Sequence, residues 1–93
     1  MEKVTIFYLE HCPYCRKAQQ AVGELLTREP AFGKLAIDWV EESRQPELAD
    51  QYDYYFVPSV FAGKEKLYEC LPSEDYDSIH RHLREAFAQA MSI

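Results

Sequence analysis

The stretch VTIFYLEHCPYC, residues 4–15, joins an alternating apolar run to a pair of cysteines. Both alternating sets in residues 4–9 are largely apolar, which is typical of a strand buried on both faces of a sheet. Pro13 suits the first position of a helix, because its missing N–H would have no partner there in any case. Residues 14–28 then carry apolar side chains at helical spacing. We therefore predict a strand followed directly by a helix, with the cysteine pair at their junction.

The rest of the chain continues the pattern of strands and helices. Residues 35–41 alternate as a second strand, and the helix between the two strands indicates a parallel βαβ unit. We predict a short helix over residues 43–52 and an antiparallel hairpin formed by residues 56–61 and 65–70. A final amphipathic helix is expected to begin at Ser73, a residue type that commonly caps helices.

The order βαβ-α-ββα predicts an α/β fold with a four-stranded mixed sheet flanked by three helices. With 93 residues, the chain is expected to form a single domain over residues 1–93. A hydrophobic fraction of 47% fits a globular protein, and a formal charge of −6 argues against nucleic acid or an anionic membrane as partner. We find neither a leader pattern nor an apolar run long enough to span a membrane, so we expect a cytoplasmic monomer.

Cys12 and Cys15 are placed for thiol chemistry. Free N–H groups and the positive end of the helix dipole favour a thiolate at the start of a helix. A count of three cysteines fits a structural disulfide framework poorly, and stable disulfides are rare in the cytosol. We expect Cys12 to attack a substrate disulfide and Cys15 to resolve the mixed disulfide that results.

Other interpretations of the pair remain open. The cysteines could be inert core residues, or the domain could be an adaptor without turnover. They could also hold a metal ion or an iron–sulfur cluster, although zinc prefers four ligands at regular spacing. The residues that could complete such a site are His11, Cys70, His80 and His82, none of which has ligand spacing, and Cys70 is more simply explained as a core residue.

The chain resembles the glutaredoxins, within the thioredoxin superfamily, in Cys12-Pro13-Tyr14-Cys15 and in Val57-Pro58 before a strand. The resemblance covers nearly the whole chain and implies a thioredoxin fold. It implies that Cys12 is the nucleophile and Cys15 the resolving cysteine, and that Pro58 is cis and packs against them. It further implies that the main chain of Val57 pairs with an extended substrate, and that Tyr14 forms a wall of the substrate groove.

The supporting residues of the motif are Pro13 and His11, the latter expected to shape the surroundings of the cysteines or to face solvent. The resemblance implies no cofactor beyond the redox-active Cys12–Cys15 disulfide and no resident metal. Disulfide-containing proteins or low-molecular-weight thiols are the expected partners, with a reductase or a thiol as electron donor.

Two departures from the glutaredoxin pattern concern glutathione. Family members usually carry a Gly-Gly pair before the last helix, where the glutamyl end of glutathione binds, whereas this chain has Leu-Pro-Ser-Glu-Asp at residues 71–75. They also tend to have a basic residue three positions before the first cysteine, where this chain has Leu9. We therefore expect glutathione to bind weakly. The neighbouring aromatic run of residues 52–56 is expected either to border a substrate groove or to pack on the core.

Overall fold

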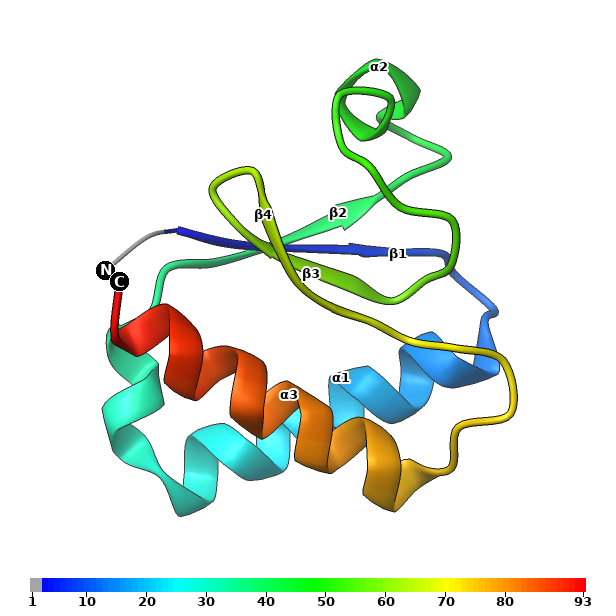
Figure 1. Ribbon diagram of the computed structural model, residues 1–93. Coiled ribbons are helices and arrows are strands. Elements are labelled where there is room, and N and C mark those ends of the chain that lie inside the picture. The colour runs from blue at the N-terminus through cyan, green and yellow to red at the C-terminus, as the bar shows by residue number, and fades with distance from the viewer. Residues whose placement is uncertain (1–2) are drawn as a thin grey trace.

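The computed structural model describes residues 3–93 and consists of a central sheet with helices on both faces (Figure 1). Its strands and helices confirm the expected order of elements. In chain order they are β1 (Val4–Tyr8), α1 (Pro13–Arg28), the 3-10 helix η1 (Pro30–Lys34), β2 (Ile37–Glu41), α2 (Pro46–Ala49), β3 (Ser59–Ala62), β4 (Glu65–Glu69) and α3 (Tyr76–Met91).

The four strands are arranged in the order β2-β1-β3-β4. β1 pairs in parallel with β2 and antiparallel with β3, and β3 pairs antiparallel with β4. Central strands need apolar side chains on both faces, which is why β1 is buried along almost its whole length. The mixed four-stranded sheet predicted from the pattern is thus confirmed.

Two apolar clusters hold the layers together. The larger lies between the sheet and the helices α1 and α3, which run side by side below the sheet in Figure 1. The smaller, on the opposite face, consists of Phe7, Val40 and Phe61, with Tyr52 and Tyr54 packed against it. None of the helices in residues 3–93 has the length and apolar character that a membrane crossing requires.

Two predicted helix boundaries were wrong. α2 spans only Pro46–Ala49, because the chain then continues in tight turns that place Tyr52 against Phe7, with 4.7 Å between ring centroids. α3 begins at Tyr76 rather than near Ser73, whose φ of 79° is incompatible with a helix start.

Candidate active site

Cys12 occupies the N-cap position of α1, with extended backbone angles. No side chain within residues 3–93 caps this helix, its first turn carries no acid, and Pro13 occupies the first turn as predicted. The N–H groups at this end of α1 are therefore available to a sulfur anion on Cys12, which is partly exposed.

Cys15 lies one turn further on and is 1% exposed. Burial, together with the neighbouring Cys12, raises the pKa of Cys15 to about 12 despite a hydrogen bond from the Leu9 N–H. The Leu9 nitrogen lies 3.5 Å from the Cys15 sulfur. At neutral pH Cys15 is therefore a protonated thiol behind a more accessible Cys12.

Pro58 follows a cis peptide bond from Val57 and is fully buried at the start of β3. Because β3 runs antiparallel to β1, with Ser59 opposite Phe7, Pro58 comes at the end of β1 that leads into the cysteine motif. The cis bond expected from the resemblance is present. Val57 is half-buried and packs on the smaller apolar cluster.

The loop between β1 and Cys12 is held by residues that follow β2. The buried carboxylate of Glu41 accepts hydrogen bonds from the Glu10 N–H at 3.0 Å and from the N–H and hydroxyl of Ser43 at 2.7 and 2.6 Å. The bond from Glu10, with those from Ser43, lowers the pKa of Glu41 to about 2. The carboxylate of Glu10 pairs with Arg44 at 2.7 Å, so its charge next to the cysteines has a cation as partner.

Tyr14 connects the motif to the segment before α3. Its hydroxyl accepts a hydrogen bond from the Ser73 N–H at 2.8 Å, and the Lys17 ammonium lies 5.7 Å from the centre of its ring. His11 is exposed with a φ of 68°, so it shapes the motif through its backbone, at the turn into α1.

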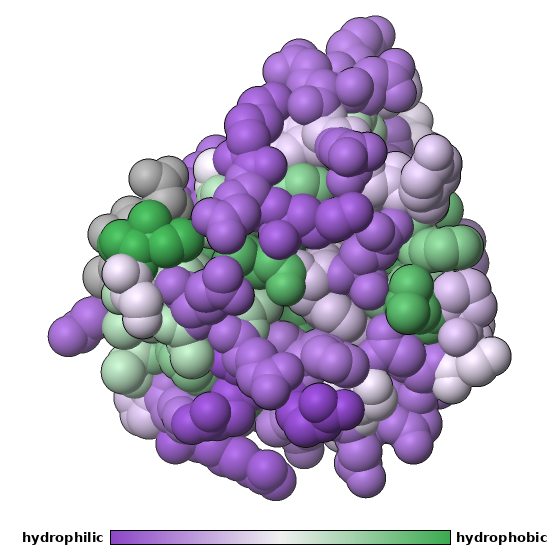
Figure 2. Space-filling view, viewed as in Figure 1, coloured by the Kyte–Doolittle hydropathy of each residue, from purple (hydrophilic) through white to green (hydrophobic). Residues whose placement is uncertain are grey.

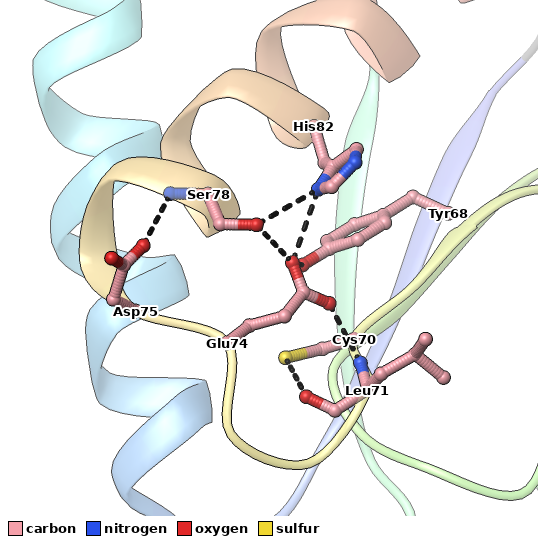
Figure 3. Close-up of polar contacts among 7 residues, drawn as sticks. All are labelled: Tyr68, Cys70, Leu71, Glu74, Asp75, Ser78 and His82. Carbon is pink, nitrogen blue, oxygen red and sulfur yellow. Dashed lines mark hydrogen bonds and ion pairs between the residues drawn. The ribbon is translucent and has the colours of Figure 1, made fainter.

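Glu74 lies before α3 with its carboxylate directed back toward β4 (Figure 3). One oxygen accepts from the Leu71 N–H at 2.7 Å, and the other lies 3.0 Å from the Tyr68 hydroxyl, 2.7 Å from the Ser78 hydroxyl and 3.0 Å from His82 Nδ1. Burial disfavours the charged form, yet these hydrogen bonds hold the pKa of Glu74 below its usual value. In the segment that departs from the glutaredoxin pattern, residues 71–75, the chain's own Glu74 therefore occupies the Leu71 N–H.

Cys70 is buried in the larger apolar cluster, as expected for a core residue. Its N–H donates to the Pro58 carbonyl at 2.9 Å, so the end of β4 is joined directly to the cis proline. Burial raises the pKa of Cys70 to about 11.

Two of the four aromatic side chains before Pro58 take the core-packing role, which was one of the two expected. Tyr52 and Tyr54 pack on the core, with Tyr54 stacked 5.0 Å from Phe7 between ring centroids. Tyr55 and Phe56 are instead exposed.

Three charged residues that shape the site were not found from the sequence. They are Glu41, Arg44, which pairs with Glu10, and Glu69, which accepts from the N–H groups of Tyr55 and Phe56. Glu41 could have been recognised, because an acid at the end of a strand often binds free backbone N–H groups.

The described residues contain no group of three or more His, Cys, Asp or Glu side chains placed to hold a metal ion. His82 stacks on Tyr68, and His80 packs beside Tyr76, so both histidines have protein neighbours. The metal-binding alternative thus has no set of ligands in residues 3–93.

Comparison with known proteins relates the chain to two groups. It is 33% identical to glutaredoxin-1 of Sus scrofa over 86 residues, which cover 85% of this chain and 74% of that protein. It is 29% identical to glutaredoxin-1 of Oryctolagus cuniculus over 75 residues, which cover 73% and 66%. No family model matches the chain.

Among solved structures, thioredoxin 1 from Thermosipho africanus aligns with a TM-score of 0.60 and 11% identity, covering 96% of this chain and 98% of that one. A mutant thioredoxin from Halobacterium salinarum aligns with a TM-score of 0.57 and 23% identity, covering 90% and 72%. These likenesses confirm the thioredoxin fold.

Fold and relatives together define the class of protein, a thiol–disulfide oxidoreductase of the thioredoxin superfamily. Within that class, the identity to the pig protein over most of both sequences shows that the chain belongs to the glutaredoxin family.

Proposed function

We propose that the protein reduces disulfides of proteins or mixed disulfides by cycling Cys12 and Cys15 between dithiol and disulfide. The observation that carries this proposal is the placement of a partly exposed Cys12 at the uncapped N-terminus of α1, with the buried Cys15 one turn behind it. A helix N-terminus without a capping side chain stabilises a sulfur anion, which is the reactive form in thiol exchange.

The exchange proceeds in two balanced steps. The Cys12 thiolate attacks one sulfur of the substrate disulfide, forms a mixed disulfide and releases the other substrate sulfur as a thiolate. Cys15 then attacks the Cys12 sulfur, its proton passes to the departing thiolate, and the substrate leaves with two electrons. Burial and the neighbouring Cys12 raise the pKa of Cys15, and formation of the mixed disulfide removes the part that is due to Cys12. Cys15 is therefore more acidic at the stage at which it must react.

The segment around Pro58 positions the substrate. We infer that an extended substrate lies along the main chain of Val57, beside the cis proline, as in strand addition. Tyr14 forms a wall on the other side, fixed by the hydrogen bond that its hydroxyl accepts from Ser73.

Glutathione is expected to bind weakly at this site. Two backbone donors in and before the first turn of α3 already bind acids of the chain, because the Leu71 N–H donates to Glu74 and the Ser78 N–H to Asp75. Robust glutathione-dependent turnover of a small uncharged disulfide would contradict this part of the proposal.

Mass spectrometry of single variants tests the cysteine roles. After a short exposure to hydroxyethyl disulfide, the Cys15→Ser variant should retain one mercaptoethanol adduct, while the parent protein should form an internal disulfide. Cys12→Ser should do neither, and Cys70→Ser should behave as the parent. An adduct that forms equally on Cys12→Ser would overturn the assignment of the nucleophile.

A further inference from the structure

Three large apolar side chains stand exposed on segments that adjoin Pro58. Tyr55 is 90% exposed, Phe56 is 46% exposed and Leu71 is 57% exposed. Among the described residues the other exposed large hydrophobic side chain is Ile93, at the C-terminal end. Figure 2 shows a mostly hydrophilic face with green side chains gathered at its left and a smaller green group near its right edge, the side on which α1 begins in Figure 1. Apolar side chains gathered beside a reactive group indicate an interaction surface more strongly than scattered ones do.

The three residues adjoin the site along the chain, and one backbone hydrogen bond joins their two segments. Phe56 directly precedes the Val57–Pro58 bond, and Leu71 directly follows Cys70, whose N–H binds the Pro58 carbonyl at 2.9 Å. We call Tyr55, Phe56 and Leu71 the apolar rim.

Carboxylates of the chain fix the backbone of the apolar rim. One oxygen of Glu69 accepts from the N–H groups of Tyr55 and Phe56, at 2.7 and 2.6 Å, and Glu74 accepts from the N–H of Leu71 at 2.7 Å. Hydrogen bonds to charged acceptors are the stronger kind, so the backbone is held while the apolar side chains remain in solvent. An ordered apolar surface loses little entropy when a partner binds.

The same contacts determine which charge this surface accepts. The N–H groups of the apolar rim are occupied by acids of the chain, so an acidic substrate finds no free backbone donor there and meets two carboxylates instead. Glu69 is itself paired with Lys66 at 2.8 Å. The nearby cations Arg16 and Lys17 belong to α1 rather than to the apolar rim.

We propose that the apolar rim binds extended polypeptide segments whose disulfide cysteine is flanked by apolar residues, in preference to small anionic disulfides. This inference rests on the proposed function, because Cys12 must attack the disulfide that the segment presents. The partner is thus a protein in an extended or partly unfolded state, with its cysteine beside apolar and not acidic neighbours.

The test uses three short peptides of equal length, each with one cysteine linked to 2-thiopyridine, an uncharged leaving group. Their cysteines are flanked by Phe and Leu, by two Ser, or by Asp and Glu. The rate constant for reaction with the reduced protein should be about tenfold higher for the apolar than for the acidic peptide, the factor expected from partial burial of one large apolar side chain. The Ser-flanked peptide should react at an intermediate rate.

Variants separate the apolar rim from general hydrophobicity. Tyr55→Ser, Phe56→Ser and Leu71→Ser, singly and together, should reduce the ratio of apolar to acidic rates, with the triple variant near unity. Ile93→Ser, which also removes an exposed apolar side chain, should keep the parent ratio. Circular dichroism verifies that each variant is folded.

The outcomes distinguish the two proposals. Two outcomes would contradict the proposed role of the apolar rim while leaving the cysteine chemistry intact. They are equal rates for the apolar and acidic peptides, and an unchanged ratio in the triple variant. Failure of every peptide and of hydroxyethyl disulfide to react at Cys12 would instead overturn the proposed function.

Discussion

The helices α1 and α3 are each 16 residues long and pack against the same face of the sheet, yet their N-termini differ. At α1 the N-cap is a cysteine, without a capping side chain in the described structure and without an acid in the first turn. At α3 the N-cap Asp75 accepts from the Ser78 N–H at 2.9 Å, and Asp77 lies in the first turn. The start of α3 is thus stabilised by acids of the chain, whereas the start of α1 keeps its N–H groups for a reactive sulfur.

The largest expected effect comes from placing a capping side chain at the N-terminus of α1. Cys12→Asp should eliminate disulfide reduction and also make the protein more stable than Cys12→Ala, by about 1 kcal/mol, because aspartate caps a helix and alanine does not. Urea unfolding of the reduced variants measures the difference. Equal stabilities would show that the N–H groups of α1 are not available to a ligand at this position.

Removing the charge of Glu74 should cost about 2 kcal/mol at pH 7, since the Tyr68 hydroxyl, the Leu71 N–H and the Ser78 hydroxyl lose a charged acceptor. The pKa of Glu74 is lowered in the folded state, so its contribution is present above the unfolded pKa of about 4 and is lost as pH falls through the folded pKa. The free energies of unfolding of Glu74→Gln and of the parent protein, measured from pH 7 to pH 3, should therefore approach each other as the pH falls. The matched control is Glu85→Gln, on the exposed side of α3, which should change little.

The converse change removes the capping side chain from the N-terminus of α3. Asp75→Ala should cost about 1 kcal/mol through loss of the N-cap, while Asp77→Ala should cost only a few tenths, because it affects the helix dipole alone. Thermal or urea unfolding measures both. Equal losses from the two variants would show that the Asp75–Ser78 hydrogen bond contributes nothing beyond charge.

The smallest effect concerns the contact between the two helix starts. Tyr14→Phe removes the acceptor of the Ser73 N–H and should cost about 0.5 kcal/mol, because water replaces the bond at an exposed backbone group. Tyr55→Phe, which alters an exposed hydroxyl, is the control and should be neutral. A loss above that of Asp75→Ala would contradict this ranking.

Sequence reasoning succeeded where the determinants are local. The buried strand, Pro13 and the apolar spacing of α1 lie within one short stretch, so the β1–α1 junction and the two cysteines could be predicted. The start of α3 could not, because Ser73 and Asp75 are both good capping residues and only the backbone of the loop decides between them.

Glu41 was missed for a different reason. Glu41 contacts Glu10 across 31 positions of the sequence, and that contact exists only once β1 and β2 are paired. Likewise, a run of four aromatic residues gives no indication that two pack on Phe7 while Tyr55 and Phe56 remain in solvent.

The hydrogen bonds to Glu41 have a consequence for kinetics. Its pKa of about 2, together with the lowered values of Glu69 and Glu74, keeps the acids that hold the site ionised above about pH 5. These three carboxylates thus do not change charge over the range in which thiol exchange is measured. An inflection in the pH–rate profile above about pH 5 therefore does not arise from Glu41, Glu69 or Glu74, the acids that hold the backbone around Cys12 and Pro58.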